Sequence, residues 1–225
     1  MILILCGGRG SRLSGVWDKP KILAPVGDKP YIKRLFSMLE PICCEQKITL
    51  ATGIGSNAIR QYLDEQGLNV NISEERNELG TGGALLYFLK QYNDSRITVI
   101  NGDTLYNAKD IENYFFIERN STNKNLIATR KVGFNDRFGH VHMDEVVKIK
   151  RPDEPMRNSE VFAGIVTLNI DQLRDKEIIN CSLENIINEM KIAGSDIIQI
   201  DLEYDFYDIG TPISLKDAEE WWKKS

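Results

Sequence analysis

The 225-residue sequence contains few metal-binding or disulfide-forming side chains and no long hydrophobic run. It has two histidines and four cysteines, and no two cysteines form a C-x-x-C pair. This argues against a zinc site or a disulfide framework, and we interpret Cys6, Cys43, Cys44 and Cys181 as reduced packing residues. The apolar segment at residues 1–6 is much shorter than a membrane span of roughly 18 residues or a signal-peptide core. We therefore expect a cytoplasmic protein without a membrane partner.

The sequence also lacks an excess of positive charge. It has 28 lysines and arginines against 33 aspartates and glutamates, a formal net charge of −5. Proteins that bind a nucleic-acid backbone concentrate positive charge, so we expect no nucleic-acid partner. With 42% hydrophobic residues and neither a repeat nor a linker, the chain is predicted to form a single domain, 1–225, with halves 1–124 and 125–225.

Hydrophobic periodicity predicts an α/β fold. Ile32, Leu35, Phe36 and Leu39 have helical spacing, and short apolar runs flank such segments. This alternation is typical of a Rossmann-like, doubly wound and mostly parallel sheet. Beyond about residue 125 the apolar runs follow one another closely, which predicts a small inserted antiparallel or mixed β region. The expected strands are Ile2–Cys6, Lys47–Ala51, Asn69–Ile72, Ile97–Ile100, Leu126–Thr129, His140–His142, Val146–Ile149, Val161–Leu168 and Ile197–Ile200.

A glycine-rich segment, LCGGRGSRL, follows the first expected strand. Glycines at the carboxyl end of a parallel strand let backbone N–H groups approach phosphate oxygens, and Arg12 adds a planar fork of donors. We therefore predict a polyphosphate site at Leu5, Gly7, Gly8, Gly10, Ser11 and Arg12. An ordinary tight turn with a solvated arginine would fit the same residues.

Two other phosphate-binding motifs do not fit this segment. A Walker loop requires Gly-Lys-Ser/Thr, which is absent. In the dinucleotide fingerprint, Leu13 stands where a glycine or alanine belongs, and the second strand ends in Ala51-Thr52-Gly53 without the ribose-binding acid. An NAD-dependent enzyme is therefore disfavoured.

Four blocks in order resemble the sugar-1-phosphate nucleotidyltransferases. GGRGSRL followed by Pro20-Lys21 is similar to their signature GGxGTRLxxxxxxxPK. ELGTGGA from Glu78 is similar to their base-binding loop, and Asn101-Gly102-Asp103 and Tyr207–Pro212 are similar to their two metal motifs. Taken alone, either aspartate would be typical of an ordinary turn, and a lysine beside a proline would be typical of an exposed surface residue.

The resemblance implies a nucleotide-diphospho-sugar transferase fold and transfer of a nucleoside monophosphate from an NTP to a sugar 1-phosphate. Arg12, Lys21 and Asp103 would be catalytic, with Arg12 on the β- and γ-phosphates and Lys21 on the α-phosphate or the sugar phosphate. Asp103 and Asp208 would hold Mg²⁺. The nucleotide would also contact Glu78, Gly80, Thr81, Gly82 and Gly102. The missing side chains of the loop Gly80–Gly83 would leave room for a base, and Gly102 would let the ligand approach.

The second half supplies the expected sugar-phosphate site. Phe138-Gly139, Phe162-Ala163-Gly164 and Ser182-Leu183-Glu184 resemble the family's sugar-binding segments, although a solvated glutamate at a helix start would fit Glu184 as well. The chain departs from the family's Glu-Lys-Pro at Lys150-Arg151-Pro152, where a cation replaces the glutamate. The sugar phosphate is therefore expected to contact Lys21, Gly139, Lys150, Arg151, Gly164 and Glu184.

Within the family, the resemblance favours GTP with a heptose or mannose 1-phosphate. A cytidylyl- or thymidylyltransferase acting on another phosphorylated small molecule, and a catalytically silent sugar-nucleotide-binding subunit, remain alternatives. A homodimer is compatible with Trp221 and Trp222, which would lie in an interface or in the core.

Overall fold

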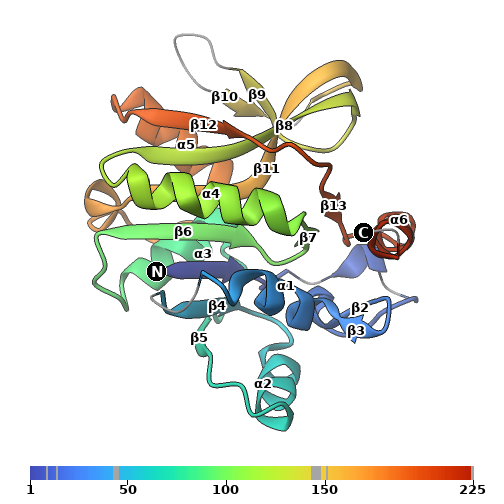
Figure 1. The fold of residues 1–225 in the computed structure, drawn as a ribbon. Helices are drawn as coiled ribbons and strands as arrows, with labels where there is room; N and C mark the ends of the chain where they lie inside the picture. The colour runs from blue at the N-terminus through green and yellow to red at the C-terminus, as the bar shows by residue number, and fades with distance from the viewer. Residues whose placement is uncertain (9, 14, 43–45, 143–147, 151, 224–225) are drawn as a thin grey trace.

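The computed structural model describes residues 1–8, 10–13, 15–42, 46–142, 148–150 and 152–223. Within these residues, nine strands form one sheet that runs through both halves of the chain (Figure 1). Its parallel part has the order β6, β1, β4, β5, and antiparallel β11 extends it beyond β6. These strands are β1 (Ile2–Leu5), β4 (Ile48–Thr52), β5 (Asn71–Glu74), β6 (Arg96–Asn101) and β11 (Met156–Asn169). The expected doubly wound, mostly parallel α/β fold is confirmed.

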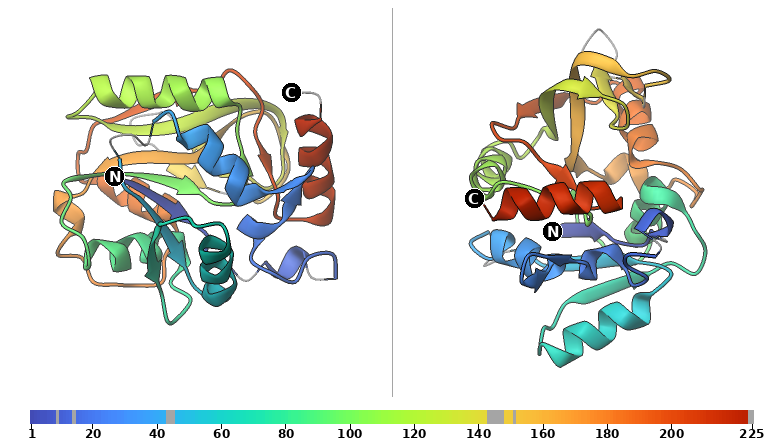
Figure 2. Two further views of the ribbon diagram at one scale, coloured as in Figure 1. Left: turned by 60° about the horizontal axis from the view of Figure 1, so that its bottom comes forward. Right: turned by 90° about the vertical axis from the view of Figure 1, so that its right-hand side faces the viewer.

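Helices cover both faces of this sheet. Alternating residues of β1 enter opposite cores, with Ile2 and Ile4 on one side and Leu3 and Leu5 on the other. The first core includes residues of α1, α2 and α4, and the second includes residues of α3 and α5 (Figures 1 and 2). These helices are α1 (Tyr31–Leu39), α2 (Ser56–Glu65), α3 (Gly80–Leu89), α4 (Ala108–Asn120) and α5 (Leu183–Ile192).

The expected mixed β region extends the sheet past β11. Strand β11 pairs antiparallel with both β8 and β9, β8 pairs in parallel with β12, and β9 pairs with β10. The pairing of β11 with β8 shifts register between Phe162 and Val166, around Gly164. The four strands are β8 (Asn125–Asn135), β9 (His140–His142), β10 (Lys148–Lys150) and β12 (Ile197–Asp201). Residues 146 and 147 of the expected strand before Lys148 lie outside the described part of the chain.

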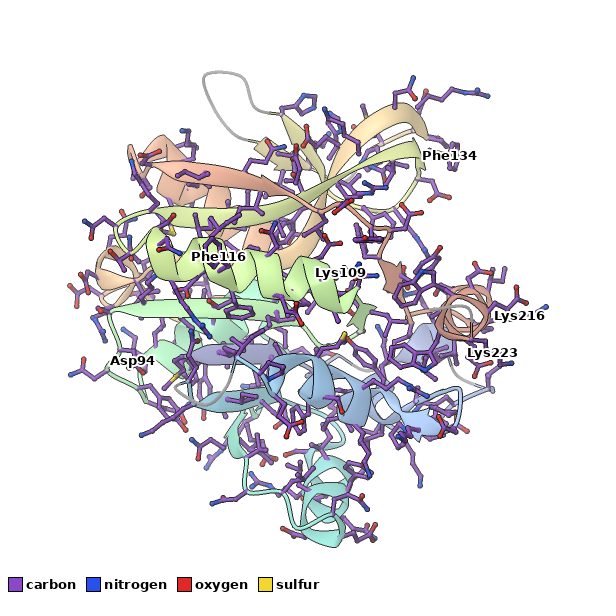
Figure 3. The ribbon with its side chains drawn as sticks, in the orientation of Figure 1. Asp94, Lys109, Phe116, Phe134, Lys216 and Lys223 are labelled. Atoms are coloured by element: carbon purple, nitrogen blue, oxygen red, sulfur yellow. The ribbon has the colours of Figure 1, made fainter. Side chains whose placement is uncertain are left out.

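Helix α4 and several very short elements were not among the expected elements. The inner face of α4 buries Ile111, Tyr114 and Phe115, whereas Phe116 lies on its outer side (Figure 3). Two-residue strands form two additional pairs, β2 (Pro25–Val26) with β3 (Lys29–Pro30), and β7 (Thr104–Leu105) with β13 (Tyr207–Asp208). The 3-10 turns are η1 (Ser11–Leu13), η2 (Lys21–Leu23) and η3 (Asp171–Leu173).

The last helix, α6 (Pro212–Trp222), packs beside the β2–β3 hairpin and α1 (Figures 1 and 2). Trp222 lies against the guanidinium of Arg34, which is 4.0 Å from the ring centroid and is ion-paired with Asp28 at 2.6 Å. Trp221 and Trp222 thus pack, partly buried, against the first core. Among the described residues, no helix combines the length and apolarity of a membrane span. Cys6 and Cys181 are free thiols, and Cys43 and Cys44 lie outside the described residues.

Candidate active site

A cavity of about 730 Å³ opens where β1, β4, β5 and β6 end. Ligands of open α/β sheets bind at this carboxyl edge. Twelve of the expected site residues line it: Leu5, Gly7, Gly8, Arg12, Lys21, Glu78, Gly80, Thr81, Gly102, Asp103, Lys150 and Glu184. The side chain of Ser11 and all of Arg151 lie outside the described residues.

The glycine-rich loop connects β1 to η1, which carries Arg12. Gly10 has a φ of +65°, a conformation that favours glycine, and its carbonyl accepts the Leu13 N–H at 2.8 Å. The turn therefore depends on Gly10 for its conformation. Gly8 has open space where a side chain would stand, so its backbone is accessible to a ligand in the cavity.

Asp103 lies between the end of β6 and the start of β7, and it forms an ion pair with Lys21. The Lys21 Nζ and Asp103 Oδ2 atoms are 3.0 Å apart, and the two side chains are 15% and 32% exposed. Two buried tyrosines fix the backbone next to Asp103. The Tyr31 hydroxyl donates to the Thr104 carbonyl, and the Tyr106 hydroxyl donates to the Ala163 carbonyl at 2.9 Å. These contacts position the carboxylate at the edge of the cavity.

The second expected metal ligand, Asp208, lies beside the first. Antiparallel pairing sets Asp208 opposite Thr104, and the Ile209 N–H donates to the Asp103 carbonyl at 2.8 Å. A β-carbon on Gly210 would lie 3.0 Å from Asp208 Oδ1 and 3.2 Å from the Arg12 guanidinium. The Lys21 ammonium would lie 3.6 Å from the same point. The structure thus gathers both aspartates and both expected catalytic cations, although they are up to 196 positions apart in the sequence.

Asp208 is held by three donors. Its Oδ1 accepts the Gly210 N–H at 2.8 Å and the Ser214 hydroxyl at 2.9 Å. Its Oδ2 lies 2.9 Å from a guanidinium nitrogen of Arg137, a residue that the sequence motifs did not indicate. No local signal in the sequence identifies Arg137, because it comes from the β8–β9 turn and meets Asp208 only in the fold.

These two carboxylates fit a Mg²⁺ site that has only one or two protein ligands. The described residues contain no group of three or more histidine, cysteine, aspartate or glutamate side chains arranged to hold a metal. Mg²⁺ in nucleotide-dependent enzymes, however, needs only one or two carboxylates, because substrate phosphates and water complete its octahedral shell. Asp103, just before β7, and Asp208, on the paired strand β13, match that smaller requirement.

The glycines of the expected base-binding loop have a different physical role from the one predicted. A β-carbon on Gly80 would lie 2.5 Å from the Cys181 carbonyl, and one on Gly82 would lie 2.4 Å from the Ser182 carbonyl. The Gly82 N–H also donates to the Cys181 carbonyl at 2.9 Å. The space left by the missing side chains is thus filled by residues 179–182 and not by a base. Gly80 and Thr81 still line the cavity, whereas the Gly82 amide already has a partner within the chain.

Gly102 likewise leaves room for a neighbouring segment of the backbone, the end of β1. Its β-carbon would lie 2.6 Å from the Leu5 carbonyl, which accepts the Gly102 N–H at 2.8 Å. The absent side chain thus permits close packing on the end of β1, and it does not provide the open approach for a ligand that the sequence suggested.

Glu75 is a second cavity residue that the sequence motifs did not indicate. It follows β5, and one carboxylate oxygen would lie 3.0 Å from a β-carbon on Gly7. Within the described structure, its Oε2 is buried without a hydrogen-bond partner. Burial is the main cause that raises the pKa of Glu75 to about 7, and the charge of Glu78 raises it further, against a backbone hydrogen bond at Leu79. Its place directly after a parallel strand is the signal that could have identified it.

Of the described residues expected to bind the sugar phosphate, Lys21, Lys150 and Glu184 line the cavity, whereas Gly139 and Gly164 are not among its lining residues. A β-carbon on Gly139 would lie 3.9 Å from a carboxylate oxygen of Glu184, so these two residues face each other. Gly164 has a φ of +82° and packs against Asn101, whose amide nitrogen would lie 2.6 Å from an added β-carbon. Lys150 lines the cavity and pairs with Asp153 at 2.6 Å, in an exposed ion pair.

Comparisons with known proteins identify the family. Residues 2–143 match the MobA-like NTP transferase domain. The chain is 30% identical over 218 residues to D-glycero-alpha-D-manno-heptose 1-phosphate guanylyltransferase of Campylobacter jejuni, covering 93% of this chain and 94% of the relative. It is 37% identical over 107 residues to the protein of the same name from Aneurinibacillus thermoaerophilus, covering 46% of each chain.

Solved structures agree as well. HddC from Yersinia pseudotuberculosis, also solved in complex with GMP-PN, has a TM-score of 0.79. It is 26% identical without the nucleotide, and 98% of each chain is covered. A Bacillus anthracis protein described as a putative glucose-1-phosphate thymidylyltransferase, 23% identical with a TM-score of 0.84, shares the fold across 100% of this chain and 95% of its own. The chain belongs to the MobA-like NTP transferase family, among its sugar-1-phosphate nucleotidyltransferases.

Proposed function

We propose that the protein transfers guanylate from GTP to a heptose 1-phosphate, forming a GDP-sugar and releasing pyrophosphate; mannose 1-phosphate is the second candidate acceptor. The observation that carries the proposal is the cluster of Arg12, Lys21 and Asp103, which line the cavity, with Asp208 directly beside them. Both the substrates and the pyrophosphate product are polyanions. A site that presents cations and metal-binding carboxylates together suits an in-line transfer between them.

The cations have separate roles in this proposal. Arg12, carried by η1 after the glycine-rich loop, would bind the β- and γ-phosphates and neutralise the departing pyrophosphate. Lys21 would leave Asp103 for the α-phosphate, where negative charge shifts during transfer. No covalent intermediate with the protein is required, because the sugar phosphate oxygen itself attacks the α-phosphorus.

Asp103 and Asp208 would hold Mg²⁺, which would supply positive charge that reduces the repulsion between the two anionic substrates. The Gly210 N–H and the Ser214 hydroxyl orient the Asp208 carboxylate for this role. The pairing of β7 with β13 keeps the two carboxylate-bearing segments adjacent before any ligand binds. The protein thus provides the orientation in advance, so substrate binding need not supply it.

Glu75 supports guanine as the base. A carboxylate can accept two hydrogen bonds, and the Watson–Crick edge of guanine offers two adjacent donors, N1–H and N2–H. The unpartnered buried Oε2 of Glu75, at the end of the cavity formed by Gly7 and Ala51, would gain such a donor. Two relatives that are named guanylyltransferases, and HddC in complex with GMP-PN, support the same base.

Glu184, Gly139 and Lys150 would receive the sugar phosphate. The Glu184 carboxylate would accept hydrogen bonds from sugar hydroxyls, and Lys150 would attract the phosphate. The heptose acceptor is supported by two relatives, both D-glycero-alpha-D-manno-heptose 1-phosphate guanylyltransferases.

The test is pyrophosphate release over a panel of GTP, UTP, CTP, dTTP and ATP with heptose, mannose and glucose 1-phosphates, with and without Mg²⁺. We expect turnover with GTP and heptose 1-phosphate that requires the divalent ion. Turnover with another pair would replace the substrates but keep the reaction. The absence of turnover with every pair, together with tight binding of a GDP-sugar, would instead identify a silent binding subunit.

Two substitutions test the metal assignment directly. Asp103→Asn and Asp208→Asn keep the side-chain volume but remove the charge, so each should lower kcat by about two orders of magnitude or more. Asp205→Asn is the matched control, because Asp205 lies three residues before Asp208 and pairs with Arg130 outside the cavity. Near-normal kcat in either of the first two variants would refute the assignment.

A further inference from the structure

Arg137 forms an ion pair with one of the two proposed metal-binding carboxylates. Its guanidinium nitrogen lies 2.9 Å from Asp208 Oδ2, and the Arg137 and Asp208 side chains are 39% and 15% exposed. The opposite oxygen, Oδ1, accepts hydrogen bonds from Gly210 and Ser214. Since those two donors leave Oδ2 as the carboxylate's outward oxygen, Arg137 occupies the position through which Asp208 would reach a cation.

The two proposed metal ligands are thus each matched with one cation of the chain. Lys21 pairs with Asp103 at 3.0 Å, and Arg137 pairs with Asp208 at 2.9 Å. Asp208 on β13 lies opposite Thr104, the residue after Asp103, so the two carboxylates would otherwise repel each other. The pairing offsets this repulsion in the ligand-free protein, and it also reduces the affinity of the carboxylates for an external cation.

The backbone that carries Arg137 is fixed, whereas its side chain is partly exposed. The Asn135 side-chain oxygen accepts the Arg137 N–H at 3.2 Å and the Phe138 N–H at 2.9 Å, which closes the turn. The Phe138 ring packs against Phe206, with centroids 5.0 Å apart, in the segment that leads to Asp208. The turn is therefore anchored next to Asp208, and only the Arg137 side chain needs to move for the ion pair to open.

We propose that Arg137 is an internal counter-ion that holds Asp208 in the free enzyme and that a divalent cation displaces on binding. The inference rests on the proposed function of Asp208 as a metal ligand. The displaced guanidinium stays close to the site, because its turn is anchored beside Asp208 and two residues from Gly139, which faces the cavity residue Glu184. There it can donate to phosphate oxygens of the substrates. Binding of the metal and binding of the nucleotide phosphates are then mutually favourable, because each draws one member of the ion pair away from the other.

The test is a titration of the substrate-free protein with Mn²⁺, followed by electron paramagnetic resonance of the free ion. Arg137→Met keeps an unbranched apolar stem and removes the charge, so Mn²⁺ should bind roughly two- to fivefold more tightly, the range for a partly exposed ion pair. Arg130→Met is the matched control. Arg130 lies on β8, the strand that precedes the Arg137 turn, and pairs with Asp205 at 3.1 Å. The R130M variant should bind Mn²⁺ like the wild type. Asp208→Asn should weaken binding in both backgrounds.

A second titration separates the counter-ion role from a purely structural one. Addition of a non-hydrolysable GTP analogue should tighten Mn²⁺ binding in the wild type by a larger factor than in R137M, since only the wild type has an ion pair to open. A change in folding alone would not reduce this factor selectively.

The outcomes distinguish the inference from the proposed function. If the wild type binds Mn²⁺ through Asp208 but R137M binds it with equal or lower affinity, Arg137 is not a competing counter-ion and the inference fails alone. If neither protein binds Mn²⁺, with or without nucleotide, the metal assignment fails and takes the inference with it. Tighter binding by R137M, lost again in the double variant with Asp208→Asn, supports both.

Discussion

The proposed contact of Glu75 with guanine predicts that GTP binding depends on pH. Burial raises the pKa of its carboxyl to about 7, so the neutral acid is well populated in the free enzyme at neutral pH. Only the ionised carboxylate presents two acceptors to guanine. We therefore expect the affinity for GTP to rise as the pH increases through about 7 and then to level off. Equilibrium binding of a GTP analogue between pH 6 and 8.5 checks this, and in Glu75→Gln the rise should disappear.

Glu75→Gln should also change base selectivity. The amide offers one acceptor and one donor in place of two acceptors, so one guanine donor would lose its partner. The ratio of kcat/KM for GTP to that for the other NTPs should fall by roughly tenfold or more. Glu74→Gln is the matched control, because the neighbouring Glu74 forms an exposed ion pair with Arg60 at 2.8 Å. Equal GTP selectivity in E75Q and wild type would refute guanine reading by Glu75.

The same carboxyl predicts an effect on stability that needs no substrate. Because the folded-state pKa of Glu75 is raised from 4.5 to about 7, the folded protein binds the proton more strongly, and stability falls as the pH rises through this interval. E75Q should therefore match the wild-type Tm near pH 4.5 and exceed it above pH 7. In Glu74 the Arg60 hydrogen bond lowers the pKa, so E74Q should have the opposite sign and lose stability at neutral pH. Thermal unfolding of the three proteins across this pH range measures both effects.

At the residue scale, motifs predicted the residues that carry a local pattern and missed those that meet only in the fold. Asp103 and Lys21 belong to recognisable blocks, and the structure brings them into contact at 3.0 Å. Arg137 follows an unremarkable turn and reaches a carboxylate 71 positions further along the chain. Whether Asp103 and Asp208 bind a metal stays a prediction, since the structure gives the arrangement of the carboxylates and not their ligand.

At the scale of elements, the contact between the start of α3 and residues 179–182 links the two halves of the site. Leu183 donates its N–H to the Thr81 hydroxyl oxygen at 2.8 Å, and Cys181 donates to the Leu79 carbonyl at 3.0 Å. The segment leads directly into α5, which carries Glu184 in its first turn. A displacement of the first turn of α3 would therefore move a residue expected to bind the sugar.

Gly82→Ala tests this link. The β-carbon of the new alanine would lie 2.4 Å from the Ser182 carbonyl and 2.8 Å from the Cys181 sulfur, so the segment that contains these two residues must shift. Overpacking of this kind costs about 1–3 kcal/mol of the free energy of unfolding. We expect a lower Tm together with a higher KM for the sugar phosphate. Gly133→Ala is the control, since nothing lies within 4 Å of its β-carbon and its φ is not positive, so the protein should retain the wild-type Tm and KM. A G82A protein with both values unchanged would contradict the proposed link.

Periodicity identified the strands and failed where a polar residue replaced an apolar one. In α4, Ile111, Tyr114 and Phe115 fall at i, i+3 and i+4, but the next position of the stripe is Glu118, which is buried in an ion pair with Arg96. The apolar pattern therefore stops one turn early. The pairs β2–β3 and β7–β13 are only two residues per strand, and segments that short carry no recognisable period.

For the whole molecule, strand β6 connects a stabilising cluster at one end to the proposed chemistry at the other. Arg96 begins the strand, and its guanidinium pairs with Glu118 at 3.0 Å and donates to the Lys124 carbonyl at 2.6 Å and to the Asn169 side chain at 2.9 Å. These contacts join α4, the start of β8 and the end of β11. Asp103 follows the opposite end of β6, at the cavity. Stability and catalysis should therefore respond to different substitutions along one strand.

Arg96→Met would leave the Glu118 carboxylate buried and unpaired, since the Arg96 and Glu118 side chains are only 16% and 10% exposed. Breaking such a buried pair costs about 3–5 kcal/mol. We expect a large decrease in the urea midpoint but wild-type kcat/KM in the fraction that remains folded at low temperature. Arg60→Met removes a guanidinium that is 47% exposed and should cost less than about 1 kcal/mol. Asp103→Asn should show the converse, with turnover lost and a smaller decrease in the midpoint, because the Asp103 side chain is 32% exposed. If Arg96→Met lowered kcat in the folded protein as strongly as it lowered the midpoint, the two ends of β6 would be coupled, and the active-site geometry would depend on the distant cluster as well as on its own contacts.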